Sequence, residues 1–382
     1  MPKTEFTSDN DQTTDFNSAT NDQTIGSFAQ SYEFGAELPY FEMELADAPP
    51  DLEDRYQLRE KLGEGTYGEV WKAFDRTIGR DIAMKRYKTT GSIGQKMCKV
   101  EVELTGALDH PGIPTIYDVD QNEDGESYFL MKYITGETLK SIIQRLRDGD
   151  RNLHKIYHYN KRVDIILQLL RTLSAVHAKG IIHRDIKPEN IIIDPSGSAY
   201  LMDWGVALNL SVSDGADTLC GTPMYMSPEQ AQRQSLDHRS DLYSLTAVFY
   251  EFISLQYYGP EPTQEELLAK ITQHTVPDID QIQNPLQGGF VPSEYKAFSI
   301  RGLKKNRDER FFAAEEMLVE LQGIQNGDFC SICVRTTLKR RLYDYANLLD
   351  WNPYIVVPAS VLVLASLFGL NLILGVLLAG WL

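Results

Sequence analysis

One short polar run, His183–Asn190, constrains the fold of this chain more than any other feature. Apolar residues flank it on both sides, at Ile181–Ile182 and at Ile191–Ile193. Pro188 inside the run has no amide hydrogen to donate, so the segment cannot continue as a helix. A plain polar turn between two apolar runs would explain this pattern, but the residue types within the run indicate a chemical role as well.

The residue types in this run match the needs of phosphoryl transfer chemistry. A loop Asp can accept the proton of an acceptor hydroxyl, and an Asn five residues later can hold a magnesium ion that bridges nucleotide phosphates. Asp185 and Asn190 have this spacing. Lys187 can neutralise charge on the transferred group. The run therefore predicts Asp185 and Lys187 as catalytic residues and Asn190 as a metal ligand.

A glycine-rich run upstream reads G-x-G-x-x-G-x-V and ends at Val70. Glycines let a hairpin turn lie close over phosphates with its amides facing them, and the valine is then placed to cover an adenine ring. Alone, this pattern is a weak signal. The nucleotide contacts that it predicts are Leu62, Gly63, Gly65, Gly68 and Val70.

The run I-A-M-K that ends at Lys85 follows Val70 at the distance expected for a strand that presents a lysine to the α- and β-phosphates. Ala83 in this run is small enough to admit adenine. Lys85 needs a carboxylate partner from the next helix to orient its ammonium group. Glu101 and Glu103 both qualify, unless the two are simply charges on a solvated helix surface.

A second metal ligand is predicted after the polar loop, where L-M-D-W-G contains Asp203. An Asp at this place in the pattern D-F-G binds magnesium directly, and the aromatic residue after it packs inside the protein. Trp204 stands where Phe is usual. Its larger indole requires a partner for the ring N–H.

Three runs downstream complete a pattern that resembles a known family: Cys220–Glu229, Ser240–Leu245 and Lys304–Phe311. With the four motifs above, they make the chain similar, from about residue 55 to 325, to the eukaryotic-like (Hanks-type) serine/threonine protein kinases, most closely to those of bacteria. The resemblance implies an α+β fold of two lobes. The small lobe, residues 55–133, would be mostly β-strand with one helix, and the large lobe, 134–325, mostly helical.

The resemblance implies an ATP site between the lobes, with Mg²⁺ or alternatively Mn²⁺ as the metal. Glu101 lies nine residues before His110, which is the register of this helix in protein kinases, so Glu101 is favoured as the partner of the strand lysine. Met131 corresponds to the gatekeeper. Lys132 and Ile134 would supply the hinge amide and carbonyl to adenine.

The same resemblance assigns roles in the large lobe. Lys187, close to Thr222, is typical of kinases that act on Ser or Thr of proteins, and Thr222 joins the catalytic group. Glu229 should pair with Arg310. The Asp of the Ser240–Leu245 run should cap the backbone of the catalytic loop.

An active kinase that phosphorylates itself and other proteins is thus expected, and Thr218 is a candidate activating phosphosite because Arg184 can pair with a phosphate. The competing function is a pseudokinase scaffold that binds partners without catalysis. Pseudokinases usually lack the strand lysine, the catalytic Asp or a metal ligand, and all of these are present here. A kinase of small molecules is disfavoured by the protein-substrate loop that ends at Glu229. A kinase dimer is a further expectation.

The first 54 residues form an acidic segment with thirteen Asp and Glu against Lys3 alone, out of a net charge of −17 for the chain. Such a composition cannot bury enough apolar surface to offset its ordering entropy, so we expect a disordered tail. No basic and apolar beginning indicates a signal peptide. The acidic balance, with a pI near 4.9, also argues against nucleic acid as a partner.

The C-terminal segment has the opposite character, since no charged residue occurs from Trp351 to Leu382. Residues 354–378 are long and apolar enough for one transmembrane helix, with residues 326–353 as a juxtamembrane linker. The basic residues before this span would keep the kinase domain in the cytoplasm and could contact anionic lipid. They are Arg335, Lys339, Arg340 and Arg341.

Four cysteines in a chain expected to be cytoplasmic argue against a disulfide scaffold. Cys330 and Cys333 have the C-x-x-C spacing, but no second pair completes a zinc site. We therefore expect free thiols.

Overall fold

The computed structural model describes residues 55–65, 68–88, 91–122, 125–213, 215, 220–257, 271, 276–284, 286, 289–328, 334–351 and 357–358. The contacts divide the chain into two units, Met1–Asp51 and Leu52–Leu382, and every described residue belongs to the second. The acidic segment therefore lies outside the described residues.

The described residues form strands and helices in the following order. The strands are β1 (Tyr56–Glu64), β2 (Gly68–Asp75), β3 (Arg80–Tyr87), β4 (Ile116–Gln121), β5 (Ser127–Lys132), β6 (Glu137–Thr138), β7 (Ile181–Ile182), β8 (Ile191–Ile193), β9 (Ala199–Leu201), β10 (Leu208–Asn209), β11 (Gln283–Asn284) and β12 (Gly289–Phe290). The helices are α3 (Gly91–Gly106), α4 (Leu139–Arg147), α5 (Arg151–Ile156), α6 (Tyr159–His177), α7 (Pro228–Ala231), α8 (Arg239–Ser254), α10 (Tyr295–Gly302), α11 (Ala314–Gln325) and α12 (Val334–Trp351), with short 3₁₀ turns η1 (Pro188–Asn190), η2 (Ile279–Gln281) and η4 (Arg307–Glu309).

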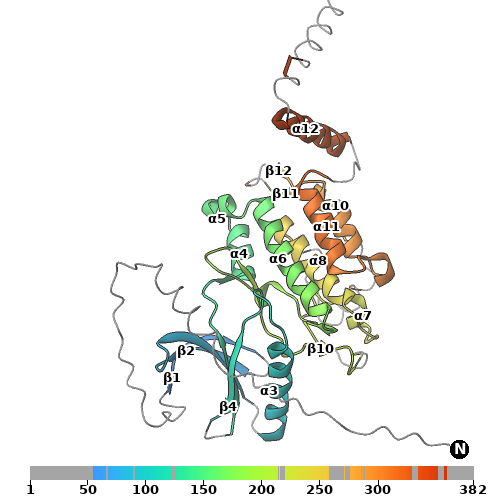
Figure 1. The fold of residues 1–382 in the computed structure, drawn as a ribbon. Helices are drawn as coiled ribbons and strands as arrows, with labels where there is room; N and C mark the ends of the chain where they lie inside the picture. The colour runs from blue at the N-terminus through green and yellow to red at the C-terminus, as the bar shows by residue number, and fades with distance from the viewer. Residues whose placement is uncertain are drawn as a thin grey trace, which may run out of the picture. The chain divides into compact units, whose positions relative to one another are not determined.

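The small lobe is an antiparallel sheet in the order β1-β2-β3-β5-β4, with α3 packed against it (Figure 1). Its central strand β3 alternates between two apolar clusters, as the two-residue period of a strand requires. Ile82 and Met84 pack in one cluster with residues of the neighbouring strands. Ala83 and Tyr87 pack in the other, which includes Cys98 of α3. The sheet is therefore buried on both faces at β3, and Lys85 lies on the face that α3 covers.

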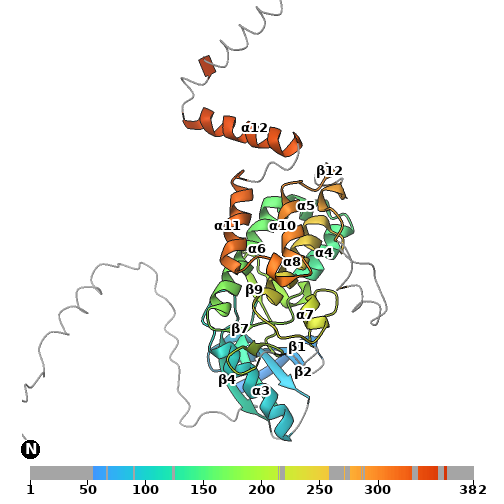
Figure 2. The same ribbon diagram turned by 90° about the vertical axis from the view of Figure 1, so that its right-hand side faces the viewer.

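The large lobe is built on helices α6, α8, α10 and α11, which lie side by side in both ribbon views (Figure 2). Helix α8 is buried along its whole length from Ser240 to Ser254. Its polar side chains can be buried because they are hydrogen-bonded, for example Asp241 to the His183 amide, Glu251 to Tyr225 and Ser240 to Glu229. The helices share one apolar core with the short strands β7, β8 and β9.

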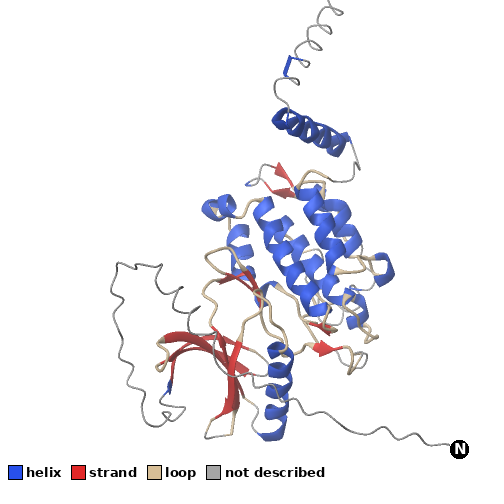
Figure 3. Cartoon of the chain, viewed as in Figure 1, coloured by secondary structure: helices blue, strands red, loops and turns tan. Residues whose placement is uncertain are grey.

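The strands gather in the small lobe and the helices in the large lobe (Figure 3), which is the two-lobed α+β fold predicted from the sequence. The polar run His183–Asn190 forms a loop between β7 and β8, as predicted, and its last three residues form the 3₁₀ turn η1.

No helix in the described part of the chain is both long and apolar enough to cross a membrane. The predicted span, residues 354–378, lies outside the described residues except for Val357 and Pro358.

Candidate active site

The strand lysine is paired with Glu101 and not with Glu103. The Lys85 Nζ atom lies 2.7 Å from Oε1 and 2.9 Å from Oε2 of Glu101, which is only 3% exposed. Glu103 is exposed and lies 3.7 Å from Lys99. The hydroxyl of Tyr87 donates a further hydrogen bond to Glu101. The Glu101 carboxylate therefore orients the Lys85 ammonium, and Tyr87, two positions after Lys85 on the strand, holds that carboxylate.

The Lys85 ammonium also lies 2.7 Å from Oδ1 of Asp203, so this one cation joins the small lobe to the large lobe. Burial lowers the pKa of Lys85, but the charges of Glu101 and Asp203 outweigh burial and leave it raised. Burial likewise raises the pKa of Asp203, while the charge and hydrogen bond of Lys85 outweigh this effect and keep it lowered. The Lys85 ammonium and the Asp203 carboxylate are therefore both ionised near neutral pH.

The predicted adenine contacts line one side of the sheet. Val70 pairs with Lys85 across β2 and β3, and Ala83 pairs with Met131 across β3 and β5. Val70 packs against the cluster that contains Ala83 and Met131. Leu62 on β1 is 42% exposed, and Ile134 after β5 is buried. Val70, Ala83 and Met131 thus form an apolar group on one face of the sheet, as contact with a purine ring requires.

Glycine stands at positions 63, 65 and 68 for different structural reasons. A Cβ atom on Gly68 would lie 2.2 Å from the carbonyl oxygen of Arg86, so the neighbouring strand requires glycine there. A Cβ on Gly63 would meet nothing within 4 Å, and one on Gly65 only the Gly68 carbonyl oxygen at 4.0 Å. The absence of a side chain at Gly63 and Gly65 thus leaves open space, which suits close approach of a phosphate. The sequence analysis assigned all three glycines to phosphate binding, and for Gly68 the close approach of the neighbouring strand is an additional reason.

The predicted hinge assignment needs a correction. The amide nitrogen of Lys132 donates to the carbonyl oxygen of Thr115, 2.9 Å away, so it is already used and Lys132 cannot supply the hinge amide. The amide of Ile134 remains the candidate donor to adenine, and Lys132 remains a candidate through its carbonyl. The error arose because strand pairing between β5 and the residue before β4 cannot be read from the local sequence.

The catalytic loop gathers four predicted residues in one hydrogen-bonded group. Oδ2 of Asp185 accepts hydrogen bonds from Lys187 Nζ at 2.6 Å and from Asn190 Nδ2 at 3.1 Å. Oδ1 of Asp185 accepts from the Thr222 hydroxyl at 2.8 Å. Lys187 Nζ also donates to the Thr222 hydroxyl oxygen at 2.8 Å. A carboxylate, an ammonium and a hydroxyl group therefore meet at one point beside the loop.

Asp241 on α8 holds the backbone of this loop. Its two carboxylate oxygens accept from the amides of His183 at 2.8 Å and Arg184 at 2.9 Å, and His177 on α6 lies 2.9 Å from Oδ2. Burial raises the pKa of Asp241, but the hydrogen bond and charge of His177 and the contacts with His183 lower it overall. The backbone cap expected from the resemblance is therefore present, and it rests on a buried carboxylate.

This anchoring explains an unusual backbone angle at Arg184. Its φ angle is 67°, in the left-handed region that non-glycine residues rarely adopt. The Arg184 amide is bound to Asp241, and its carbonyl oxygen accepts from Gln230 Nε2 at 2.9 Å. A Cβ atom on Gly221 would lie 2.6 Å from the same carbonyl oxygen. The strained residue is thus held on both sides, and only glycine fits at 221.

The Trp204 side chain is buried, and its ring N–H makes a hydrogen bond. It is 2% exposed and donates from Nε1 to the carbonyl oxygen of Leu201 at 3.2 Å. Its ring contacts that of His183 edge to face, with 4.6 Å between centroids. His183 in turn lies 2.9 Å from the Met202 carbonyl oxygen. The replacement of Phe by Trp is therefore accommodated through a partner that the Phe side chain cannot use.

The ion pair expected at the end of the substrate loop is present. Arg310 donates from its two terminal nitrogens to the two carboxylate oxygens of Glu229, both at 2.7 Å. The Arg310 side chain is 0% exposed and that of Glu229 is 4% exposed. Burial raises the pKa of Glu229, but the hydrogen bonds and charge of Arg310 lower it overall. This pair fixes α7 to the segment before α11.

A second network on the substrate loop was not predicted. The Tyr225 hydroxyl donates to Oε2 of Glu251 at 2.6 Å, and Arg147 on α4 lies 2.6 Å from Oε1. Arg147 also donates to the Leu255 carbonyl oxygen at 2.8 Å. Glu251 is 5% exposed. The network connects α4 and α8 to the loop, and no local motif could reveal it because its members lie far apart in the sequence.

The predicted metal ligands have oxygens available. Asn190 donates from Nδ2 to the Asp185 carbonyl oxygen at 2.9 Å, which leaves its amide oxygen to accept or coordinate. Asp203 uses Oδ1 toward Lys85. Among the described residues, no group of three His, Cys, Asp or Glu side chains forms a metal site. Two protein oxygens suit Mg²⁺, which keeps several waters and takes phosphate oxygens as its other ligands.

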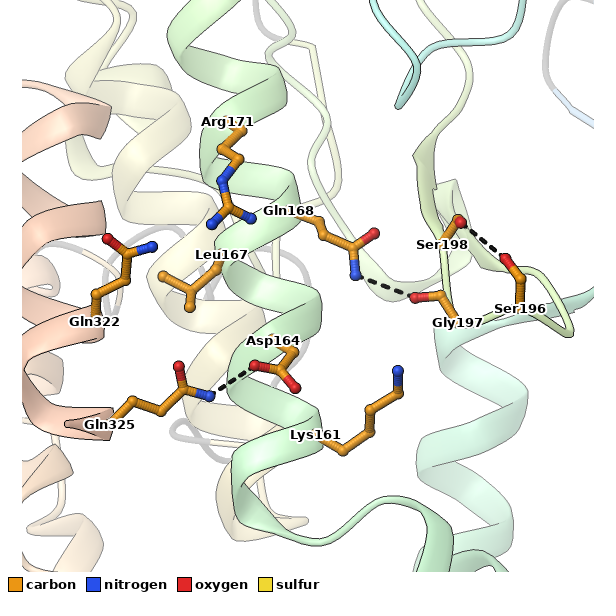
Figure 4. A pocket seen from close by; sticks show the side chains of 10 residues that line it. All are labelled: Lys161, Asp164, Leu167, Gln168, Arg171, Ser196, Gly197, Ser198, Gln322 and Gln325. Carbon is orange, nitrogen blue, oxygen red and sulfur yellow. Dashed lines mark hydrogen bonds between the residues drawn. The ribbon is translucent and has the colours of Figure 1, made fainter.

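A cavity of about 460 Å³ lies elsewhere, between α6, the turn after β8 and the end of α11 (Figure 4). Two amide side chains bridge its walls: Gln168 donates to the Gly197 carbonyl oxygen at 3.1 Å, and Gln325 donates to Asp164 at 2.7 Å. None of the predicted site residues lines it. It is therefore separate from the site described above.

Several predictions fall on residues outside the described part of the chain. They concern Thr218 and the C-x-x-C pair Cys330 and Cys333. The cysteines that the structure describes, Cys98 and Cys220, are free thiols, in agreement with the expectation. Burial raises the pKa of Cys98 to about 11, so this thiol is protonated at neutral pH.

The comparisons with known proteins agree with this geometry. The sequence profile described as "Protein kinase domain" matches residues 56–320. The serine/threonine-protein kinase PknB of Mycolicibacterium smegmatis is 32% identical over 291 residues, covering 73% of this chain and 44% of that protein. PknB of Mycobacterium tuberculosis H37Rv is 31% identical over 290 residues, with the same two shares. The serine/threonine-protein kinase pkn3 of Myxococcus xanthus is 30% identical over 287 residues, covering 71% and 50%.

The chain thus spans about half or less of the length of these relatives. Its match to the family profile covers both lobes and every residue of the site, from Leu62 to Arg310. The chain therefore belongs to the protein kinase family, on its bacterial Hanks-type serine/threonine side.

Proposed function

We propose that this chain transfers the γ-phosphoryl group of ATP to Ser and Thr hydroxyls of proteins, including its own. The observation that carries the proposal is the hydrogen-bonded group of Asp185, Lys187 and Thr222, in which a carboxylate and an ammonium converge on a hydroxyl oxygen. A hydroxyl is the acceptor that the reaction needs. The Thr222 hydroxyl therefore marks the kind of group that this corner of the site accommodates.

In the proposed reaction Asp185 accepts the proton of the acceptor hydroxyl. The acceptor oxygen forms a bond to the γ-phosphorus, the bond between that phosphorus and the β,γ-bridging oxygen breaks, and ADP leaves. Lys187, held 2.6 Å from Asp185, offsets negative charge on the transferred group. Lys85 binds the α- and β-phosphates and is kept in position by Glu101. Positioning of charges supplies most of the catalysis in such a reaction.

Asn190 and Asp203 are the proposed ligands of a divalent cation, Mg²⁺ or alternatively Mn²⁺, because both cations bind oxygen ligands. The cation supplies charge neutralisation between nucleotide phosphates. Hydrogen bonds within the chain hold both ligand side chains in position. Asn190 is held by the Asp185 backbone, and Asp203 by Lys85.

A non-catalytic scaffold finds no support in the described residues. Lys85, Glu101, Asp185, Asn190 and Asp203 are all present and in contact as pairs or groups. The direct test is purified chain with labelled ATP and a generic protein acceptor such as myelin basic protein, with and without Mg²⁺. We expect label on Ser and Thr, located by mass spectrometry, and none without a divalent cation. An absence of label on any acceptor, the chain itself included, would contradict the proposal.

The Arg147 network gives a prediction about the acceptor. Arg147→Ala removes one partner of the buried Glu251 carboxylate and weakens the hold on Tyr225 in the substrate loop. We expect the KM for a protein acceptor to rise about tenfold or more, the size of a lost charge-assisted hydrogen bond, with the KM for ATP unchanged. Steady-state kinetics with each substrate varied in turn measures both constants.

Arg145→Ala is the matched control, because Arg145 lies on the same helix and pairs with Glu137 and Asp150 at the surface. It should leave both KM values within about twofold of wild type, as exposed ion pairs contribute little. Equal effects of the two substitutions on the acceptor KM would show that α4 stability, and not the network, is responsible.

We further propose that residues 354–378 cross the membrane once and keep the kinase domain, residues 55–325, on the cytoplasmic side. The support is the charge-free sequence from Trp351 onward, preceded by basic residues. ATP is available in the cytoplasm, which is consistent with this orientation.

A truncation after Asp350 tests the anchor. It should yield an active kinase in the soluble fraction after a high-salt wash, because the residues of the site end at Arg310. The full-length chain should stay with membranes through the same wash and through alkaline extraction. Release of the full-length chain by either treatment would show that the segment does not insert.

A further inference from the structure

Tyr87 is a buried polar residue of β3 that none of the motifs accounts for. It is the last residue of the strand and is 2% exposed. Its hydroxyl donates a hydrogen bond to Oε2 of Glu101 on α3. Its ring packs with Cys98 of the same helix and with Phe129 of β5, at 6.5 Å between the two aromatic centroids. Tyr87 therefore connects the strand that carries Lys85 to the helix that carries the partner of this lysine.

The hydrogens of the Lys85 ammonium are all engaged by carboxylates. An ammonium group has three hydrogens to donate. Lys85 Nζ lies 2.7 Å from Oε1 and 2.9 Å from Oε2 of Glu101, and 2.7 Å from Oδ1 of Asp203. Among the described residues, Lys85 and Tyr87 are the side chains that donate to the Glu101 carboxylate. A phosphate that binds Lys85 must therefore displace one of these carboxylate oxygens.

Binding of a nucleotide changes this arrangement under the proposed function. Asp203 turns to the divalent cation, and Lys85 donates to the α- and β-phosphates. One ammonium hydrogen then remains for Glu101, so one of the two carboxylate oxygens loses its lysine donor. Glu101 is only 3% exposed, and a buried carboxylate oxygen without a donor is costly. Tyr87 supplies a donor at Oε2 that does not depend on Lys85.

We propose that Tyr87 is a positioning residue for nucleotide binding, whose hydroxyl holds the Glu101 carboxylate while Lys85 binds the phosphates. The inference deepens the proposed function and rests on its assignment of Lys85 to the phosphates. Burial and the charge of Glu101 raise the pKa of Tyr87, so the phenol stays protonated and donates at neutral pH. The Lys85 ammonium also lies 5.8 Å from the centroid of the Tyr87 ring, within the range of a cation–π attraction.

A purely structural tie between β3 and α3 is the other role that the Tyr87 hydroxyl could have. Such a tie would matter equally with and without a nucleotide. The proposed role matters only when phosphates are bound, because Lys85 serves both Glu101 oxygens in the free chain. Ligands with and without phosphates therefore separate the two roles.

The test is Tyr87→Phe in the full-length chain, which keeps the ring and removes the hydroxyl. Calorimetry measures the Kd of ADP with Mg²⁺, which carries the α- and β-phosphates, and of adenosine, which carries neither. The Kd for ADP should rise about tenfold or more, the size of a lost hydrogen bond to a charged group, and that for adenosine should stay within about twofold. The KM for ATP should rise by the same factor with kcat nearly unchanged, because ground state and transition state lose the same contact.

Tyr128→Phe is the matched control. It removes the hydroxyl of another buried tyrosine in the same sheet, which packs in the apolar cluster on the opposite face. It should change neither Kd. In a Glu101→Met background the Tyr87 hydroxyl has no carboxylate to hold, so adding Tyr87→Phe should not weaken ADP binding further.

Three results would overturn the inference: an unchanged Kd for ADP in Tyr87→Phe, an equal rise for ADP and adenosine, or further weakening in the Glu101→Met background. The second would indicate a purely structural tie, and the third a hydroxyl that acts elsewhere. ADP binding and labelling by ATP are read separately. A chain that binds ADP but transfers no phosphoryl group would therefore contradict the proposed reaction and not the role of Tyr87.

Discussion

Asp185→Asn should lower the rate of phosphoryl transfer by about 10²- to 10⁴-fold, the usual contribution of a general base, and leave the fold intact. An amide cannot take the proton of the acceptor hydroxyl. It can keep the present contacts, because an amide oxygen in the place of Oδ2 still accepts from Lys187 and Asn190. Its nitrogen in the place of Oδ1 can donate to the Thr222 hydroxyl oxygen. The site thus loses the base and retains its hydrogen bonds.

The measurement is single-turnover transfer of the γ-phosphoryl group, with thermal unfolding followed on the same preparation. Asp118→Asn is the matched control, since it makes the same chemical change at an exposed carboxylate of β4. It should change neither quantity. Transfer by Asp185→Asn at the wild-type rate would remove Asp185 from the mechanism, whereas a large fall in melting temperature would mean that loss of activity reports on folding.

Much of the fold and of the candidate site could be predicted because the residues with a chemical role lie within short stretches of sequence. Asp185, Lys187 and Asn190 lie within one loop, and their spacing alone predicts that they can meet around one carboxylate. The choice of Glu101 over Glu103 depended on register, and the structure pairs Glu101 with Lys85. Tyr87 was missed, although it lies two residues after Lys85 and therefore on the same face of β3.

The rest depended on contacts between residues far apart in the sequence. The pairing of the Lys132 amide with Thr115 excludes it as a hinge donor, and the Arg86 carbonyl requires glycine at position 68. Neither constraint can be recognised from the residues next to it in the sequence. The Tyr225–Glu251 contact could not be predicted either, because neither residue stands out from its neighbours in the sequence. Local motifs predicted which groups react, and tertiary packing decides how they are held.

Packing also decides how a departure from the family pattern is tolerated. Trp204 is larger than the usual Phe, and its N–H would be costly to bury without an acceptor. The carbonyl oxygen of Leu201, three residues earlier, accepts it. The sequence showed the need for a partner but not its identity, because a turn can present several carbonyl groups to a side chain.

Arg310→Met should destabilise the kinase domain by about 3–5 kcal/mol, the cost of leaving a buried charge without its partner. Arg310 donates to both oxygens of Glu229 and also, from Nε, to the Lys304 carbonyl oxygen at 2.7 Å. All of these bonds are lost at once, while the Glu229 carboxylate stays 4% exposed. The measurement is urea unfolding at neutral pH. As a control, Arg301→Met removes an arginine that is 38% exposed and should cost only about 1 kcal/mol or less.

The pH dependence identifies the charge as the cause. The pKa of Glu229 is lowered in the folded protein, so the pair contributes stability above the unfolded pKa of about 4.3 and loses it as pH falls through the lower folded value. The difference between wild type and Arg310→Met should therefore be largest at neutral pH and shrink on acidification. Adding Glu229→Leu to Arg310→Met should restore part of the lost stability, because it removes the uncompensated carboxylate. A double variant as unstable as the sum of the two single variants would show that packing, and not the ion pair, sets the cost.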